Sequence, residues 1–167
     1  QGENKMKSIL KTQEINQKLL AYIRVTGPYG QGYEEPIAKL YQWAETHSLA
    51  EGESIFIYHD NPEITPNEKC RTDICIAVPQ GTAVPKGIEL QVLPAGSYAY
   101  IRETITEKSQ YALCWDHLMS QAVKSGLALD ERPCFELYFH YDLEKDIADV
   151  GFYIFGMVFR SWINRSV

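Results

Sequence analysis

An internal repeat is the feature that most constrains how this chain can fold. Residues 21–26 (AYIRVT) return as 99–104 (AYIRET) with one difference, at an offset of 78 residues. Three further matches follow in the same order: Tyr33 with Tyr111, 56–58 with 136–138, and 73–76 with 149–152. Four matches in one order indicate a duplicated unit, in which each half reads strand–helix–strand–strand.

The periodicity within each half predicts the secondary structure. Apolar residues that alternate with polar ones indicate strands, and Ile37, Leu40, Tyr41 and Ala44 have helical spacing. We expect strands at 18–26, 54–60, 71–78, 88–93 and 133–140, and helices at 33–47 and 111–124. The predicted fold class is α+β: a duplicated strand–helix–strand–strand repeat with an antiparallel sheet, two helices on one face and a ligand cleft on the other.

The expected organisation is one domain with two short flanking segments. Residues 1–14 are predicted to be a polar linker or tail, and 15–154 a domain of two pseudo-repeats at about 15–80 and 88–154. Residues 155–167 are predicted to be an extension that covers the cleft mouth, packs in a homodimer or is simply added. The total of 167 residues suits one compact unit.

Charge and composition exclude several classes of protein. A net charge of −6 argues against electrostatically driven nucleic-acid binding, which needs clustered Lys and Arg. The 4 Cys and 4 His lack the spacing of a zinc site, so we expect free thiols, no metal and no cofactor. Residues 1–8 do not resemble a signal peptide and no apolar run is long enough to span a bilayer, so a cytoplasmic location is expected.

Side-chain alternation predicts which residues line the cleft. In 133–140, Phe135, Leu137 and Phe139 would face the helices, which leaves Glu136 and Tyr138 in the cleft. The same rule turns Ile55 and Ile57 of the earlier strand toward a helix and Phe56 and Tyr58 into the cleft. The strand at 71–78 would place Asp73, Cys75 and Ala77 in the cleft, and the last strand Gly151 and Tyr153.

Glu136 is the strongest candidate for a functional residue. It lies in the most aromatic strand with no Lys or Arg within three positions. A carboxylate in an apolar hollow is costly unless it is protonated or meets a cation. The alternative is a solvent-facing Glu on an ordinary amphipathic strand. The other candidate ligand-binding residues are aromatic, and for each the alternative is routine strand or core packing: Tyr58, Trp115, Phe56, Tyr138, Tyr22, Tyr100, Tyr153 and Trp43.

Enzyme motifs are absent from the sequence. It has no nucleophile elbow, no phosphate loop and no dinucleotide fingerprint. Cys134 and His140 would lie about 20 Å apart on one strand, too far for a nucleophile and its base. A hydrolase that uses Glu136 as general base remains open.

Five motifs in order resemble a known family. They are YIRVTGPY at 22–29, YHDNP at 58–62, TP at 65–66, KCRTD at 69–73 and PCFELY at 133–138. Together they resemble the GyrI-like family, which includes the DNA gyrase inhibitor protein and the effector-binding domains of AraC- and MerR-type multidrug regulators. The resemblance spans about residues 15–154.

The resemblance implies a bacterial small-molecule-binding domain with a cleft between its halves. It implies that Glu136 meets the charge of a lipophilic cation and that aromatic rings, first Tyr58 and Trp115, contact the ligand. Only about 15 residues precede the domain, too few for the DNA-binding segment of an AraC-type regulator. We therefore expect a stand-alone module or an excised transcription-regulator domain that does not itself contact DNA or a membrane.

The leading hypothesis is a non-enzymatic effector-binding module for lipophilic cationic small molecules or drugs. The first alternative is a gyrase-inhibitor-like protein-interaction module, whose partner would be gyrase or a separate DNA-binding component. A weaker alternative is a small-molecule hydrolase that uses Glu136. A homodimer is a further expectation.

Overall fold

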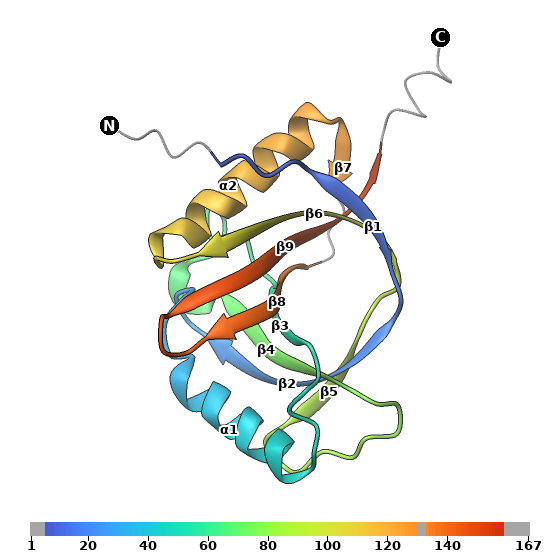
Figure 1. The fold of residues 1–167 in the computed structure, drawn as a ribbon, viewed down its shortest axis with the longest axis vertical. Coiled ribbons are helices and arrows are strands. Elements are labelled where there is room, and N and C mark those ends of the chain that lie inside the picture. The colour runs from blue at the N-terminus through green and yellow to red at the C-terminus, as the bar shows by residue number, and fades with distance from the viewer. Residues whose placement is uncertain (1–5, 130–132, 159–167) are drawn as a thin grey trace.

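A computed structural model of the chain describes residues 6–129 and 133–158. Each half of the chain contributes one helix and several strands (Figure 1). In chain order the elements are β1 (Lys11–Ile15), β2 (Lys18–Thr26), α1 (Glu34–Thr46), β3 (Ser54–Tyr58), the 3₁₀ turn η1 (Asn67–Lys69), β4 (Arg71–Val78), β5 (Glu89–Leu93), β6 (Gly96–Ile105), α2 (Ser109–Lys124), β7 (Leu127–Leu129), β8 (Cys134–Asp142) and β9 (Ile147–Val158).

The strands form one curled antiparallel sheet. Its order is β1-β6-β9-β8-β3-β4-β2-β5, and β7 pairs with the far end of β9. Strands β3 and β8, one from each half, lie side by side at the centre. Figure 1 shows the sheet curving round between α2 at one end and α1 at the other. The fold class is therefore α+β, as the sequence predicts.

Both faces of the sheet are buried against apolar side chains. On the outer face, α2 covers β6 and β9 through residues such as Leu118 and Phe152, and α1 covers β2 and β4 through Leu40 and Ile74. On the inner face of the curl, a third cluster includes Phe135 and draws on strands from both halves. Both faces of the central strands are therefore covered by other side chains. A residue on either face of these strands is buried, and the candidate site lies on one of these covered faces.

The two halves pair their strands with the same register. Ile23 of β2 lies opposite Ile74 of β4, and 78 residues later Ile101 of β6 lies opposite Phe152 of β9. Strand β1 pairs with β6, whereas its equivalent in the second half, β5, pairs with β2. The first strand of each half is thus exchanged onto the other half.

Three details differ from the sequence expectations. Residues 11–14, expected in a tail, belong to β1. Strand pairing makes Phe152 the equivalent of Ile74, because each lies opposite the equivalent isoleucine, Ile101 or Ile23. The two equivalent residues are 78 positions apart, whereas the sequence match of this segment used an offset of 76. Residues 155–158, expected in an extension, continue β9. The rest of the expected C-terminal extension, 159–167, lies outside the described residues.

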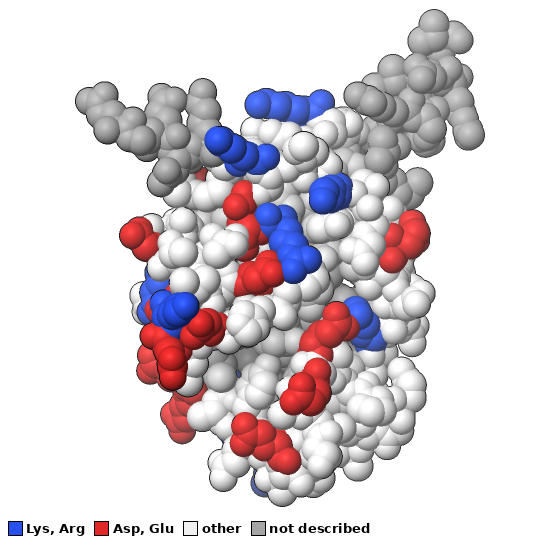
Figure 2. Space-filling view, viewed as in Figure 1, with Lys and Arg blue, Asp and Glu red and all other residues white. Residues whose placement is uncertain are grey.

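One face of the molecule is mixed in charge (Figure 2). Figure 2 shows acidic and basic side chains interspersed on one face, without a broad basic patch on it. Within residues 6–129 and 133–158, no helix is long and apolar enough to cross a membrane. No group of three or more metal-binding side chains occurs in that part of the chain either.

Candidate functional site

Glu136 lies at the centre of the outer face, between the regions that α1 and α2 cover. On β8 it pairs across the sheet with Phe56 of β3 on one side and Phe152 of β9 on the other. Its side chain is buried, with 1% of its surface exposed. Because opposed residues in an antiparallel pair project to the same face, the carboxylate is held between two phenyl rings.

Three neutral donors hold the carboxylate. The Tyr58 hydroxyl donates to Oε1 at 2.8 Å, and the Tyr138 hydroxyl donates to the same oxygen at 3.1 Å. The Trp115 indole N–H donates to Oε2 at 2.9 Å. The donors come from β3, β8 and α2, so both halves of the molecule contribute to one group.

The environment raises the pKa of Glu136. Burial disfavours the charged form and is the largest influence, whereas the hydrogen bonds from Trp115, Tyr58 and Tyr138 act in the opposite direction. The net effect raises the pKa of Glu136 from 4.5 to about 7. Near neutral pH the group therefore exists in both protonation states.

A hydrogen-bond chain continues from the site into α2. The hydroxyls of Tyr138 and Tyr111 lie 3.0 Å apart. Tyr138 is the donor of this bond as well as of the one to Glu136, so its single hydroxyl hydrogen is shared between the Tyr111 oxygen and the carboxylate. Among the described residues, no buried side-chain nitrogen or oxygen lacks a hydrogen-bond partner.

Aromatic rings enclose the carboxylate. The ring of Phe56 lies 5.3 Å from that of Tyr138, and Trp115 packs edge-on at 5.3 Å from Phe152 and 6.0 Å from Tyr58. Tyr29, in the loop before α1, covers the far side of Tyr58 at 5.0 Å. The arrangement is a negative group within an aromatic cage, which is the chemistry that attracts an organic cation.

The cage is closed in this structure. Two hollows of about 330 and 170 Å³ lie elsewhere, one between β2 and the start of α1 and the other beside β1 and β6, and Glu136 lines neither. With 1% of Glu136 exposed, a ligand must displace at least one aromatic neighbour to reach the carboxylate.

The structure corrects the face that was predicted for β8 and β3. Phe135 and Leu137 lie on the inner face with Ile55 and Ile57, away from the helices. The site therefore lies on the helix-covered face, and not on the opposite one. The prediction assumed that apolar residues mark the helix side, but the inner face of the curled sheet is a core as well. For β4 and β9 the predicted faces agree with the structure.

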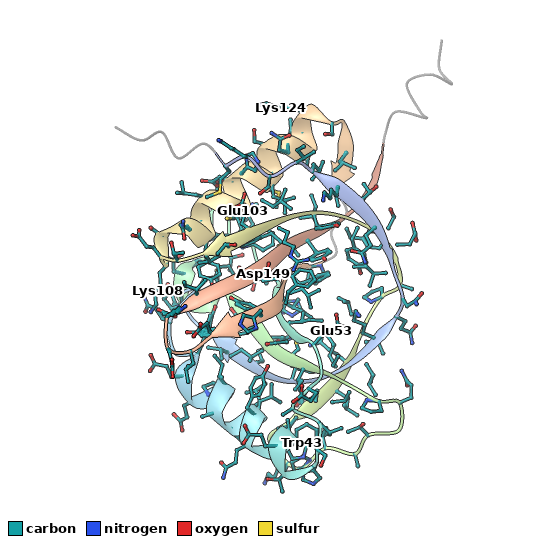
Figure 3. All side chains as sticks on the ribbon, in the orientation of Figure 1. Trp43, Glu53, Glu103, Lys108, Lys124 and Asp149 are labelled. Carbon is teal, nitrogen blue, oxygen red and sulfur yellow. The ribbon has the colours of Figure 1, made fainter. Side chains whose placement is uncertain are left out.

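The predicted aromatic residues lie in three different places. Tyr58, Trp115, Phe56 and Tyr138 surround Glu136. Tyr22, Tyr100 and Tyr153 pack with the inner-face cluster, where Tyr100 stacks on Tyr153 at 4.8 Å. Trp43 packs in the core beneath α1 beside His47. In Figure 3 it lies at the opposite end of the view from Lys124, the last residue of α2.

Sequence reasoning missed several members of the cage. Phe152 faces Glu136 directly, and Tyr29 closes one side. Tyr33 and Tyr111 occupy equivalent positions in the two halves, and their rings pack on Phe56 and Phe152. The sequence match between Tyr33 and Tyr111 could have identified them. In a duplicated fold, equivalent residues that lie beside the central strands of the two halves come close to the same central site.

A second buried carboxylate lies on the inner face. Asp73 is fully buried and accepts hydrogen bonds from Arg24 at 2.7 and 3.0 Å, from Gln91 at 2.8 Å and contacts His59 at 2.6 Å. The Arg24, His59 and Gln91 bonds outweigh the effect of burial and hold the pKa of Asp73 well below its usual range. This carboxylate is a charged group with its counter-charge already present.

A curled antiparallel sheet with two helices, and a carboxylate caged by rings from both halves, defines a binding domain for small molecules. The profile of the GyrI-like small molecule binding domain matches residues 11–150, and the chain belongs to that family. It is 27% identical over 144 residues to a DNA gyrase inhibitor of Klebsiella pneumoniae, across 84% of this chain and 91% of the relative.

Solved structures share the fold. The EcmrR C-terminal domain superposes with a TM-score of 0.69 at 15% identity, across 91% of this chain and 99% of that one. SAV2435, solved with bound tetraphenylphosphonium, gives 0.56 at 14% identity, with 90% and 94% covered. A protein described as a hydrolase from Listeria innocua gives 0.66 at 9% identity, with 92% and 94% covered.

Proposed function

We propose that the protein binds lipophilic organic cations in the cage around Glu136. The single observation that carries this proposal is a carboxylate that is 1% exposed, has neutral hydrogen-bond donors and lacks a Lys or Arg partner among the described residues. A cation that replaces the missing counter-charge gains a charge pair in a site of low dielectric. The neighbour SAV2435, which was solved with tetraphenylphosphonium, supports the proposal.

The surrounding rings favour the same ligand class. The faces and edges of Phe56, Phe152 and Trp115 offer apolar surface to a bulky cation, and a desolvated cation gains about 2 kcal/mol from a ring. Tyr58 and Tyr138 keep the carboxylate oriented through their hydroxyls. Both an apolar body and a positive charge are therefore recognised.

Calorimetric titration with tetraphenylphosphonium, at about pH 8 where Glu136 is mostly ionised, tests the proposal. Glu136→Gln keeps the volume and removes the charge, and should weaken binding by about 10- to 100-fold. The matched control is Glu89→Gln on the inner face, where the carboxylate accepts from Tyr22. Unchanged affinity in Glu136→Gln would contradict the role of the charge, and absence of binding to any lipophilic cation would contradict the ligand class.

A hydrolase is a second candidate, favoured by one property of the same carboxylate. A pKa of about 7 suits a general base, and a structural neighbour is described as a hydrolase. Turnover of small electrophilic esters or epoxides by the wild type, lost in Glu136→Gln, is the expected result for this candidate. Turnover that survives the substitution would reject Glu136 as the base.

The relatives that are DNA gyrase inhibitors favour a third candidate, binding to a protein partner. The net charge of −6 suits a basic partner surface. A supercoiling assay with purified gyrase measures this activity directly, and full supercoiling at saturating protein would exclude it.

A further inference from the structure

We propose that a second site, on the inner face of the sheet beside β1 and β6, binds small aromatic carboxylates. It is separate from the cage around Glu136 and does not depend on the proposed cation binding. The inference starts from a difference between the two halves of the duplicated fold. The first half places two carboxylates on the inner face, whereas the second half has a lysine and a glycine at the equivalent positions.

The first difference lies beside a tyrosine that both halves share. In the first half, Tyr22 of β2 lies opposite Glu89 of β5, and its hydroxyl donates to that carboxylate at 3.1 Å. In the second half, the equivalent Tyr100 of β6 lies opposite Lys11 of β1. The tyrosine is thus kept, but an ammonium group stands where the first half has a carboxylate.

The second difference lies beside an arginine that both halves share. Arg24 lies opposite Asp73 and donates to it at 2.7 and 3.0 Å. Its equivalent, Arg102, lies opposite Gly151 and donates instead to Asp149, at 2.8 Å through Nε and 2.6 Å through Nη2. Figure 3 labels Asp149 near the middle of the view. Because a guanidinium has five N–H groups, three of those on Arg102 can serve another acceptor.

A hollow of about 170 Å³ brings these groups of the second half together. It is lined by Ser8, Ile9, Lys11, Tyr100 and Arg102, which include two cationic side chains and no acidic one. Lys11 takes part in none of the ion pairs formed among the described residues. Since Asp149 neutralises Arg102, the hollow keeps one positive charge in excess, and this favours an anion.

The walls of the hollow favour an anion that carries a ring. Tyr100 stacks on Tyr153 at 4.8 Å, and Tyr153 stacks on Phe135 at 4.8 Å, so the ring of Tyr100 is held in place. Ile9 is 75% exposed and adds apolar surface that a ligand would cover. The hollow is smaller than the roughly 300–1,000 Å³ that drug-sized ligands occupy, so the expected ligand has a single ring, as benzoate does.

The lining groups define the expected binding mode. The ligand carboxylate would accept a hydrogen bond from the hydroxyl of Tyr100, as Glu89 does from Tyr22 in the first half. It would also pair with the ammonium of Lys11 and the free N–H groups of Arg102. Because exposed ion pairs are weak, we expect a Kd for benzoate on the order of 1 mM.

Titration with benzoate at neutral pH, followed by two-dimensional amide NMR, tests the site. Benzoate should shift the amide signals of β1 and β6 saturably. Benzamide keeps the ring and lacks the charge, and should bind at least about tenfold more weakly. Tyr100→Phe keeps the stacked ring and removes the hydroxyl, and should weaken benzoate binding by about 3- to 5-fold.

A charge reversal with a matched control separates the site from a general effect of charge. Lys11→Glu places a carboxylate opposite Tyr100, as in the first half, and should weaken benzoate binding by about tenfold or more. Lys124→Glu makes the same change of charge at the exposed end of α2, away from the hollow, and should leave the affinity within about twofold.

The remaining outcomes decide against the site. Benzoate that causes no saturable shift in β1 and β6, benzamide that binds as tightly as benzoate, or equal losses in Lys11→Glu and Lys124→Glu would each overturn the proposal. Glu136→Gln should leave the benzoate affinity unchanged, because the cage lies on the other face of the sheet. A loss of benzoate binding in Glu136→Gln would place the bound benzoate at the cage and overturn the second site, whereas failure of tetraphenylphosphonium to bind bears only on the proposed function.

Discussion

Two buried carboxylates among the residues that the structure describes have opposite environments. Asp73 on the inner face bonds to Arg24, His59 and Gln91, and its pKa is held low. Within the described part of the chain, Glu136 on the outer face bonds to hydroxyl and indole donors, and burial raises its pKa to about 7. Both are satisfied in hydrogen bonding, so the difference between them lies in charge.

Under the proposed function, this difference separates a carboxylate whose counter-charge is in place from one that an external cation would complete. Removing the counter-charge is what makes a buried acid available to an external cation, and it costs stability in the absence of ligand. Both carboxylates bond to groups from both halves, since Gln91 on β5 donates to Asp73. The contrast leads to four predictions.

The largest effect is expected at Asp73. Asp73→Asn removes the charge that Arg24 and His59 share and should lower the free energy of unfolding by about 3 kcal/mol. Urea denaturation at pH 7 measures it. A loss below about 0.5 kcal/mol would mean that the partly exposed Arg24 is adequately solvated without its partner.

The pH dependence of stability should carry opposite signs for the two groups. The pKa of Glu136 is about 7 in the folded protein against 4.5 in the reference state, so the unfolded chain loses its proton first as pH rises. Stability should therefore fall between about pH 4.5 and 7 by on the order of 2–3 kcal/mol, and Glu136→Gln should abolish that fall.

Asp73 acts in the other direction, because its low pKa makes its contribution disappear as pH falls below about 4. The acid limb of the stability curve should persist in Glu136→Gln. Urea denaturation of both proteins across this pH range separates the limbs. A fall between pH 4.5 and 7 that is equal in both proteins would contradict the assignment to Glu136.

A smaller effect is expected from the donors of Glu136. Tyr58→Phe removes a hydrogen bond that favours the ionised form and should raise the pKa of Glu136 by about one pH unit. Carbon-detected NMR titration of the Glu136 carboxyl measures this midpoint. Tyr22→Phe, which removes a tyrosine–glutamate bond on the inner face, should leave it in place.

The smallest effect is expected where the second half repeats the arginine–aspartate motif at the surface. Arg102 pairs with Asp149 at 2.6 Å, but half of the Arg102 side chain is exposed. Arg102→Ala should cost less than about 1 kcal/mol in thermal or urea unfolding, well below Asp73→Asn. Equal losses would show that burial does not govern the strength of these pairs.

Much of the fold could be predicted because local signals agree with it. Strands β2 and β4 have the bounds expected from alternation and turn residues. Apolar spacing located α1, and the match of Tyr33 with Tyr111 in the repeat located α2. Strand β1 was missed because KTQEI has no apolar alternation and is held by pairing with the distant β6. Local strand propensity carries no information about a pairing partner that is far away in the sequence.

For the candidate site, the sequence pointed to the central residue, Glu136, but not to the face of the sheet on which it lies. The lack of basic neighbours in the sequence singled out Glu136, and the structure buries it among rings, with no Lys or Arg partner in the ranges 6–129 and 133–158. The face was wrong because alternation identifies two faces but does not say which one meets a helix when both are apolar. The partners of Asp73 depend on register between β2, β4 and β5, which no local pattern contains.

The exchange of β1 and β5 has a consequence for fragments of this chain. A polypeptide that ended after β4 would carry β1 without β6 and β2 without β5. Two such fragments could complete each other by trading their first strands, giving a symmetric dimer with the architecture of the intact protein. Its central strand pair would place Phe56 opposite Phe56, so the cage would be rebuilt without its carboxylate.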